Sequence, residues 1–121
     1  MAARDPDLEE WVREHFAALG PLEMKRMFGA GAVYANGLIF ALLDDGEIWL
    51  KGDETNVPGL QSAGSRQFTY PGKDEAIMTL GYWSLPASAT DDPEEAVAWA
   101  RGAIDVALRK AAAKKPKKRT A

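Results

Sequence analysis

The pattern of apolar and polar positions is most regular between Met24 and Lys51, where short apolar segments alternate with turns that contain glycine. These turns are Gly-Ala-Gly at 29–31, Asn36-Gly37 and Asp-Asp-Gly at 44–46. Asn-Gly tolerates the positive φ angles of a type I′ turn, whose twist matches that of the two antiparallel strands it joins. The stretch therefore predicts a meander of antiparallel strands.

A second hairpin is predicted between residues 66 and 82. The segments Arg66 to Tyr70 and Ala76 to Tyr82 alternate or are apolar, and the Pro-Gly-Lys-Asp sequence at 71–74 supplies turn-forming residues between them. Residues 52–64 contain Pro58-Gly59, so we expect them to be irregular or briefly helical. The second hairpin adds two strands to the sheet.

Both ends of the sequence carry the start signal of a helix. Asp5 followed by Pro6 opens the first helix, and apolar residues then recur at helical spacing. Asp92 followed by Pro93 opens the last helix, with Glu95 placed to complete a capping box. The predicted fold class is therefore α+β, an antiparallel meander sheet flanked by an N-terminal and a C-terminal helix.

Two features predict a homodimer. The apolar residues of the last helix cover an arc of about 200°, which is more than a single sheet face covers. The strand from Leu38 to Leu43 is apolar at successive positions, so both of its faces need to be buried. We expect Phe40, Trp99 and Val106 to form dimer or core contacts.

The composition restricts the chemistry more than the fold. A length of 121 residues suits one domain, and the absence of cysteine excludes disulfides, thiolate metal sites and cysteine nucleophiles. A cysteine-free chain fits a reducing compartment, so we expect a cytoplasmic protein. The longest apolar run, Leu38 to Leu43, is far too short to span a bilayer, so we expect no membrane contact.

The charge is divided unequally along the chain. The residues before Arg109 hold eight basic and all 18 acidic side chains, a formal charge of −10, and those from Arg109 onward hold seven basic ones, a charge of +7. We therefore expect a folded domain at 1–108 and a basic, disordered tail at 109–121. The tail either contacts nucleic acid nonspecifically or serves as a solubilising end. Its candidate phosphate contacts are Lys114, Lys115, Lys117, Lys118 and Arg119.

The motifs that resemble catalytic or cofactor sites have simpler explanations. A dinucleotide fingerprint requires a third glycine where Tyr34 stands, so Gly29-Ala30-Gly31 indicates a turn or bulge. His15, the only histidine, lies on the apolar face of the first helix and is expected to pack there. A single histidine also makes a conventional zinc site unfavourable. We predict no enzymatic activity, no cofactor and no metal.

Two sets of surface residues are candidate binding sites. Lys25, Arg26 and Lys51 form a candidate patch for an anionic ligand or partner, the alternative being ordinary solvated or paired charges. The four tryptophans and three tyrosines are either an aromatic platform or core and dimer contacts. We favour the second reading because the acidic body lacks the interleaved Arg and Lys that a nucleic-acid platform needs.

Three segments in this order carry a family resemblance: RMFGAGAVYANGLIFALLDDGEIWLKGDE, AGSRQFTYPGKDEAIMTLGYWSLP and DDPEEAVAWAR. The chain resembles the TfoX N-terminal domain family, named for a regulator of natural competence, from Trp11 to about Leu108. The resemblance implies an α+β fold with terminal helices, and self-association. In the competence regulators this domain is one half of a longer chain, which acts as a coactivator alongside a cyclic-AMP-dependent transcription factor.

Residues and resemblance together predict a non-enzymatic, dimeric interaction module that regulates through protein contacts, linked to transcription or competence. One alternative is a nucleic-acid-associated protein that binds weakly through its tail. A further alternative is a small-ligand-binding or enzymatic domain that uses the sheet and the Lys25-Arg26 turn. That alternative requires a concave pocket with convergent polar groups.

Overall fold

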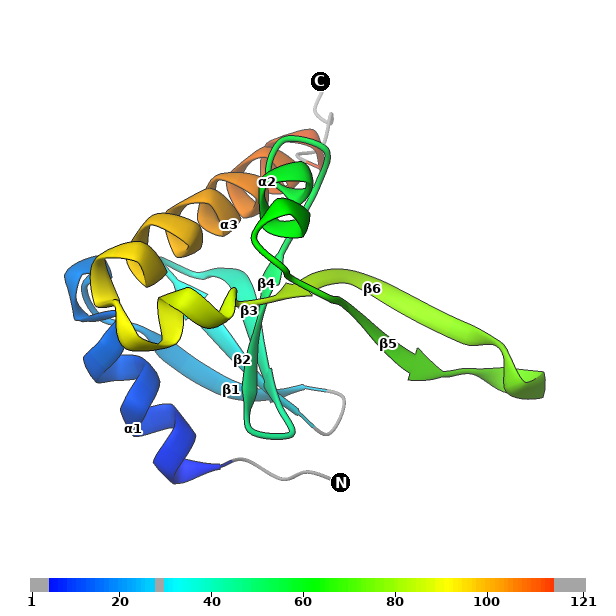
Figure 1. Cartoon of the computed structure of the whole chain (residues 1–121), viewed down its shortest axis with the longest axis horizontal. Coiled ribbons are helices and arrows are strands. Elements are labelled where there is room, and N and C mark those ends of the chain that lie inside the picture. The colour runs from blue at the N-terminus through cyan, green and yellow to red at the C-terminus, as the bar shows by residue number, and fades with distance from the viewer. Residues whose placement is uncertain (1–4, 28–29, 115–121) are drawn as a thin grey trace, which may run out of the picture.

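The computed structural model describes residues 5–27 and 30–114, which form one antiparallel sheet with helices at both ends of the chain (Figure 1). The sheet has six strands in the order β1-β2-β3-β4-β6-β5. The predicted α+β class and meander are therefore confirmed. The strands are β1 (Glu23–Met27), β2 (Ala30–Ala35), β3 (Leu38–Asp44), β4 (Glu47–Lys51), β5 (Gln67–Pro71) and β6 (Ile77–Ser84). The α-helices are α1 (Pro6–His15), α2 (Val57–Ser62) and α3 (Pro93–Lys114), and the short 3-10 helices are η1 (Ala17–Leu19), η2 (Lys73–Glu75) and η3 (Ala87–Asp91).

The helices begin where the sequence predicts. The Asp5 side chain accepts a hydrogen bond from the Leu8 amide at 3.2 Å, and the Asp92 carboxylate accepts from the amides of Glu94 and Glu95 at 3.1 and 3.2 Å. Each cap satisfies amides that have no partner inside the helix. Glu95 does not complete the predicted capping box, because its carboxylate accepts hydrogen bonds from Ser88 Oγ and Trp99 Nε1 instead.

The turns of the meander have the predicted geometry. Asn36 and Gly37 have φ angles of 52° and 81°, and Asp45 and Gly46 have φ angles of 55° and 78°. Two consecutive positive φ angles define the type I′ turn, so β2–β3 and β3–β4 are both tight hairpins. These two hairpins place β2, β3 and β4 in sequential order in the sheet.

The inner face of the sheet, the face that packs against α1 and α3, holds the main core. Alanines at 96, 100 and 103 let α3 lie close to the strands, and Val12 and Phe16 of α1 join the same cluster. Phe40 and Val106 are fully buried within the single chain, and Trp99 lies against Gly59 of α2 as well as the core. The wide apolar arc of α3 is thus covered inside one chain and does not by itself require a second copy.

Strand β3 is apolar at successive positions because it contributes to both faces. Ala41 and Leu43 belong to the inner core, whereas Leu42 lies on the opposite face. The register with β2 jumps from Val33↔Ala41 to Tyr34↔Ile39, which leaves Phe40 as the extra residue of a β-bulge. The bulge allows Phe40 and its neighbour Ala41 both to reach the inner core.

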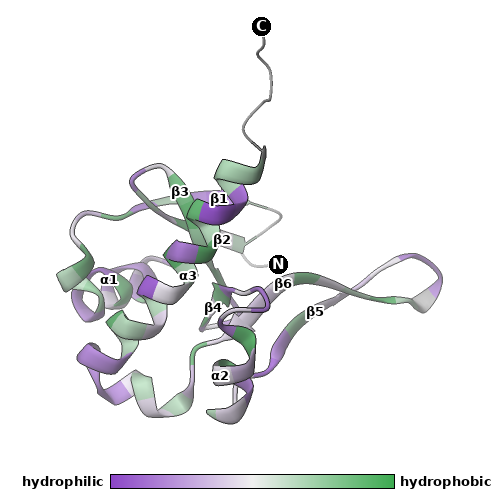
Figure 2. Ribbon diagram, turned by 90° about the horizontal axis from the view of Figure 1, so that it is seen from above, coloured by the Kyte–Doolittle hydropathy of each residue, from purple (hydrophilic) through white to green (hydrophobic). Residues whose placement is uncertain are grey.

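The β5–β6 hairpin forms an arm (residues 67–81) that projects from the body in both views (Figures 1 and 2). Strand β6 pairs with β4 only through Tyr82 to Ser84, whereas residues 77–79 pair with β5 alone. The arm therefore leaves the sheet where β4 ends.

The last helix extends further than the sequence analysis places the end of the domain. Helix α3 continues to Lys114, so residues 109–114 of the predicted tail are helical. Arg109 donates to Asp53 Oδ2 at 3.2 Å, which joins this end of α3 to the turn before α2. Positions 115–121 lie outside the described residues. No helix within the described part of the chain is both long and apolar enough to cross a membrane.

Candidate interaction surface

A second apolar cluster lies on the outer face of the sheet, opposite α1 and α3. Its buried members are Ala32, Leu42, Trp49 and Tyr82, and partly buried apolar side chains from β1, β2, β3 and the arm surround them. None of the described residues of this cluster belongs to a helix. The sheet is therefore apolar on both faces, but the helices cover only one of them.

Three cations lie over aromatic rings of the outer face. Lys25 Nζ is 5.0 Å from the centroid of the Tyr34 ring, and Lys51 Nζ is 5.8 Å from that of Tyr82. The Arg66 guanidinium carbon is 5.2 Å from the Trp49 ring. Arg66 also pairs with Glu47 at 2.5 Å. These contacts are attractive because the face of an aromatic ring is electron-rich.

The predicted cationic patch of Lys25, Arg26 and Lys51 is not one cluster. Lys25 pairs across the sheet with Ala32 of the outer cluster, and the adjacent Arg26 points to the other face because side chains alternate along a strand. Lys51 lies three strands away on β4, a separation of about 14 Å at the usual strand spacing. Lys25 and Lys51 thus flank the outer face from opposite sides.

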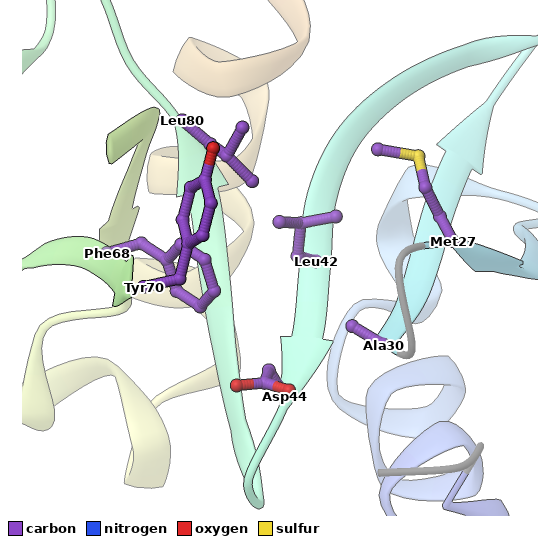
Figure 3. A pocket seen from close by; sticks show the side chains of 7 residues that line it. All are labelled: Met27, Ala30, Leu42, Asp44, Phe68, Tyr70 and Leu80. Atoms are coloured by element: carbon purple, nitrogen blue, oxygen red, sulfur yellow. The ribbon is translucent and has the colours of Figure 1, made fainter. Parts of the chain in front are cut away.

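A groove of about 300 Å³ lies on the outer face between the arm and the first three strands. Figure 3 shows its two walls and its floor. Phe68, Tyr70 and Leu80 of the arm form one wall, Met27 and Ala30 form the other, and Leu42 lies between them with Asp44 at one end. The groove is therefore mostly apolar, with one carboxylate at its end.

Burial shifts the pKa of two ionisable groups on the outer face. Burial raises the pKa of the Asp44 carboxyl above its ordinary value, and the neighbouring charge of Asp45 raises it further. Burial also raises the pKa of the Tyr82 hydroxyl to about 12, with a smaller contribution from Tyr34. Both shifts result from the apolar surroundings of the outer cluster.

The aromatic residues are divided between the two faces. Trp83 and Trp99 pack against the inner core, and Trp11 stacks on His15 with ring centroids 4.3 Å apart. Trp49 and the three tyrosines lie on the outer side of the sheet or along the groove. The sequence analysis missed the cations interleaved with these rings. Trp49 and Tyr82 are nevertheless only 8% and 5% exposed, which leaves little ring surface for a base to stack on.

The remaining candidate residues have structural positions. His15 Nε2 donates to the Ala89 carbonyl oxygen at 2.7 Å, and this bond joins α1 to η3. Gly31 lies in β2, whereas Gly29 falls outside the described residues. Lys114 is the last residue of α3, and Lys115, Lys117, Lys118 and Arg119 of the candidate tail site lie outside the described residues. Among the described residues, no group of three or more His, Asp or Glu side chains is placed to hold a metal ion.

The groove itself was not predicted from the sequence. The alternation of Phe68 with Tyr70 and of Leu80 with Tyr82 is a signal that one face of the hairpin is apolar. This signal does not indicate that the hairpin leaves the sheet and faces Met27 across a gap.

Comparison with known proteins identifies the family. The family model of the TfoX N-terminal domain matches residues 14–107. Protein Sxy of Escherichia coli (strain K12) is 24% identical over 107 residues, which cover 88% of this chain and 51% of Sxy. The chain spans about half the length of this curated relative. The match with the family model includes all six strands of the sheet. The chain belongs to the TfoX N-terminal domain family.

Proposed function

We propose that this chain is a regulatory interaction module without enzymatic activity, which forms a homodimer in the cytoplasm and acts through contacts with other proteins. The process it regulates belongs to transcription or competence. Membership of a family named for a competence regulator supports the regulatory part of this proposal.

The apolar outer face is the observation that carries the interaction part. A sheet face without helices that holds an apolar cluster and a groove is typical of a surface that contacts another protein. We assign a second copy of the chain to this face. The non-enzymatic part is supported by His15, whose ring is stacked on Trp11 and bonded to a backbone carbonyl.

Transcript levels test the regulatory part. We expect deletion of the chain in its source organism to change a defined set of transcripts, and a plasmid-borne wild-type copy to restore them. The empty plasmid is the control. Unchanged transcripts under conditions in which the protein is made would contradict a regulatory role.

Weak nucleic-acid binding by the tail is the second candidate function. The observation that favours it is the formal charge of +7 from Arg109 onward, next to a body of −10. The matched variant replaces Lys114, Lys115, Lys117, Lys118 and Arg119 with glutamine in the full chain, because a truncation at Leu108 would remove part of α3.

A salt series of DNA binding compares this variant with the wild type. Each phosphate contact is expected to contribute about 0.9 to the slope of log affinity against log salt, and the variant should lose most of that slope. Exposed Arg13, on α1, and exposed Arg101, on α3, provide a control double substitution to glutamine. Equal binding by all three proteins would rule out the tail as the binding site.

A further inference from the structure

The tip of the arm exposes apolar side chains on both of its faces. Ile77 is 72% exposed and Met78 is 41% exposed, and these are two of the three exposed large apolar side chains among the described residues. They are adjacent in β6, so they point to opposite faces of the hairpin. A tip of this kind favours a site that contacts it from two sides.

The groove on the outer face has two apolar walls. Phe68 and Leu80 form the arm side, and Met27 and Ala30 form the opposite side, with Leu42 as the floor. A groove with two such walls contacts both faces of an inserted hairpin tip. A flat apolar face would bury only one of the two side chains at the tip.

We propose that the arm tip of one copy inserts into the groove of a second copy, and that the arm of the second copy inserts reciprocally into the first. This inference rests on the proposed homodimer and names its contact surface. The contact brings Ile77 and Met78 of each copy between the two walls of the groove of the other copy.

The positions of tip and groove along the arm fit a two-fold axis. Ile77 at the tip and Leu80 in the groove wall are three residues apart on β6, about 10 Å at the usual strand rise. When the arms of two copies run antiparallel and their tips are offset by this distance, the tip of each copy lies at the groove of the other copy. One symmetry operation then forms both contacts and closes the assembly at two copies.

Asp44 supplies the charged group at the end of the groove. The connection at the arm tip carries Lys73 beside Asp74 and Glu75, so it brings no excess of positive charge to Asp44. The proposed contact therefore rests on the apolar side chains of the tip and on the offset of tip and groove along the arm.

Molar mass in solution is the first test, with two matched substitutions in the full chain. We expect the wild type at 100 µM to have twice the 13.2 kDa chain mass, and Ile77→Glu to weaken dimerisation roughly tenfold or more. Leu108→Glu is the control, because Leu108 is 50% exposed on α3 and does not line the groove. Ile77 is exposed within the single chain, so its replacement is expected to leave the circular dichroism spectrum unchanged.

A disulfide test locates the contact. The natural sequence has no cysteine, so any disulfide in a Met27→Cys, Ile77→Cys double variant must join the introduced residues. Under mild oxidation we expect the double variant to form a covalent dimer. Ile77→Cys alone is expected to stay monomeric in non-reducing gels, because the two tips lie about 10 Å apart in the proposed dimer, farther than a disulfide spans.

The outcomes separate the arm contact from the proposed function. A wild-type monomer at 100 µM would overturn both the arm exchange and the homodimer. A wild-type dimer that Ile77→Glu leaves intact, or a double variant without covalent dimer, would overturn the arm exchange alone. The second result would assign the groove to another occupant, such as a small apolar ligand. The transcript test of the regulatory role stands independently of these results.

Discussion

Gly52 and Gly59 lie in the same connection between β4 and β5, but only Gly59 has room for an added Cβ atom. A Cβ at Gly52 would lie 2.7 Å from Trp83 Cδ1 and 2.8 Å from Val57 Cγ2, whereas one at Gly59 would lie 3.6 Å from the Trp99 ring. We expect Gly52→Ala to lower the free energy of unfolding by about 1–3 kcal/mol. Gly59→Ala in α2 is expected to be neutral or to stabilise by up to about 1 kcal/mol.

Urea unfolding followed by tryptophan fluorescence measures both variants, because Trp83 and Trp99 lie beside the two glycines. An equal loss of stability in the two variants would contradict the assignment of a close approach to Gly52 alone.

Asp53 makes stability depend on pH in acid. The Thr55 hydroxyl donates to its carboxylate at 2.6 Å, and this bond and that from Arg109 lower the pKa of Asp53 below its ordinary value of 3.8. A carboxyl with a lowered folded-state pKa stabilises the fold above its unfolded-state pKa, and loses this contribution as the pH falls through the folded-state value.

We therefore expect Asp53→Asn to be less stable than the wild type at pH 7, by up to about 1 kcal/mol because the site is near the surface. The difference should shrink as the pH falls from about 5 to about 2. Urea unfolding at pH 7, 4 and 2.5 measures this difference. Thr55→Val removes the strongest contact and should show the same trend, and a difference that is independent of pH would refute the charge effect.

The stability of helix α3 depends on the side-chain contacts of its first turn. Asp92 accepts two amide hydrogen bonds there, whereas Glu95 binds Ser88 and Trp99. We expect Asp92→Ala to lower the free energy of unfolding by about 1 kcal/mol, as the loss of a helix cap usually does. Glu95→Ala should instead shift the fluorescence of Trp99, whose indole loses its acceptor. Thermal and urea unfolding measure the first effect, and an Asp92→Ala variant as stable as the wild type would contradict the role of Asp92 as the cap.

The elements were predictable because their signals are local. Asp5-Pro6, Asn36-Gly37 and Asp92-Pro93 each determine a cap or a turn through a few consecutive residues, and the structure confirms all three. The bulge at Phe40 was not predictable, because it depends on how β3 pairs with β2 and not on β3 alone. Local chemistry therefore determined where elements begin, and long-range pairing determined their registers.

The arm and the groove could not be predicted for the same reason. The departure of β6 from the sheet follows from the short length of β4, which leaves residues 77–79 of β6 with β5 as their only strand partner among the described residues. The structure places Lys25 and Arg26 next to each other in β1, so they point to opposite faces, and Met24 in the inner core fixes the side of each. The predicted patch grouped these residues with Lys51 because the strand bounds and the strand order, which separate them, depend on long-range pairing.

The two faces of the sheet differ in how far the helices of a single chain bury them. Helices α1 and α3 bury the inner face, and the main core is complete within one chain. On the outer face, side-chain cations cover three rings, and none of the described segments of the chain fills the groove beside them. Formation of the proposed dimer should therefore add burial to a fold that already exists, and folding and association should be linked by mass action.

This linkage predicts a thermal midpoint that depends on chain concentration. A tenfold rise in concentration favours a two-copy unit by about 1.4 kcal/mol, which raises Tm by about 3–6 °C for a unit of this size. Differential scanning calorimetry at 10, 100 and 1,000 µM measures the shift, and Ile77→Glu, with its exposed position, should show a smaller shift of Tm over the same range. A wild-type Tm that does not change with concentration would mean that the outer face is stable without a second copy, and that the exposed arm tip adds nothing to the stability of the fold.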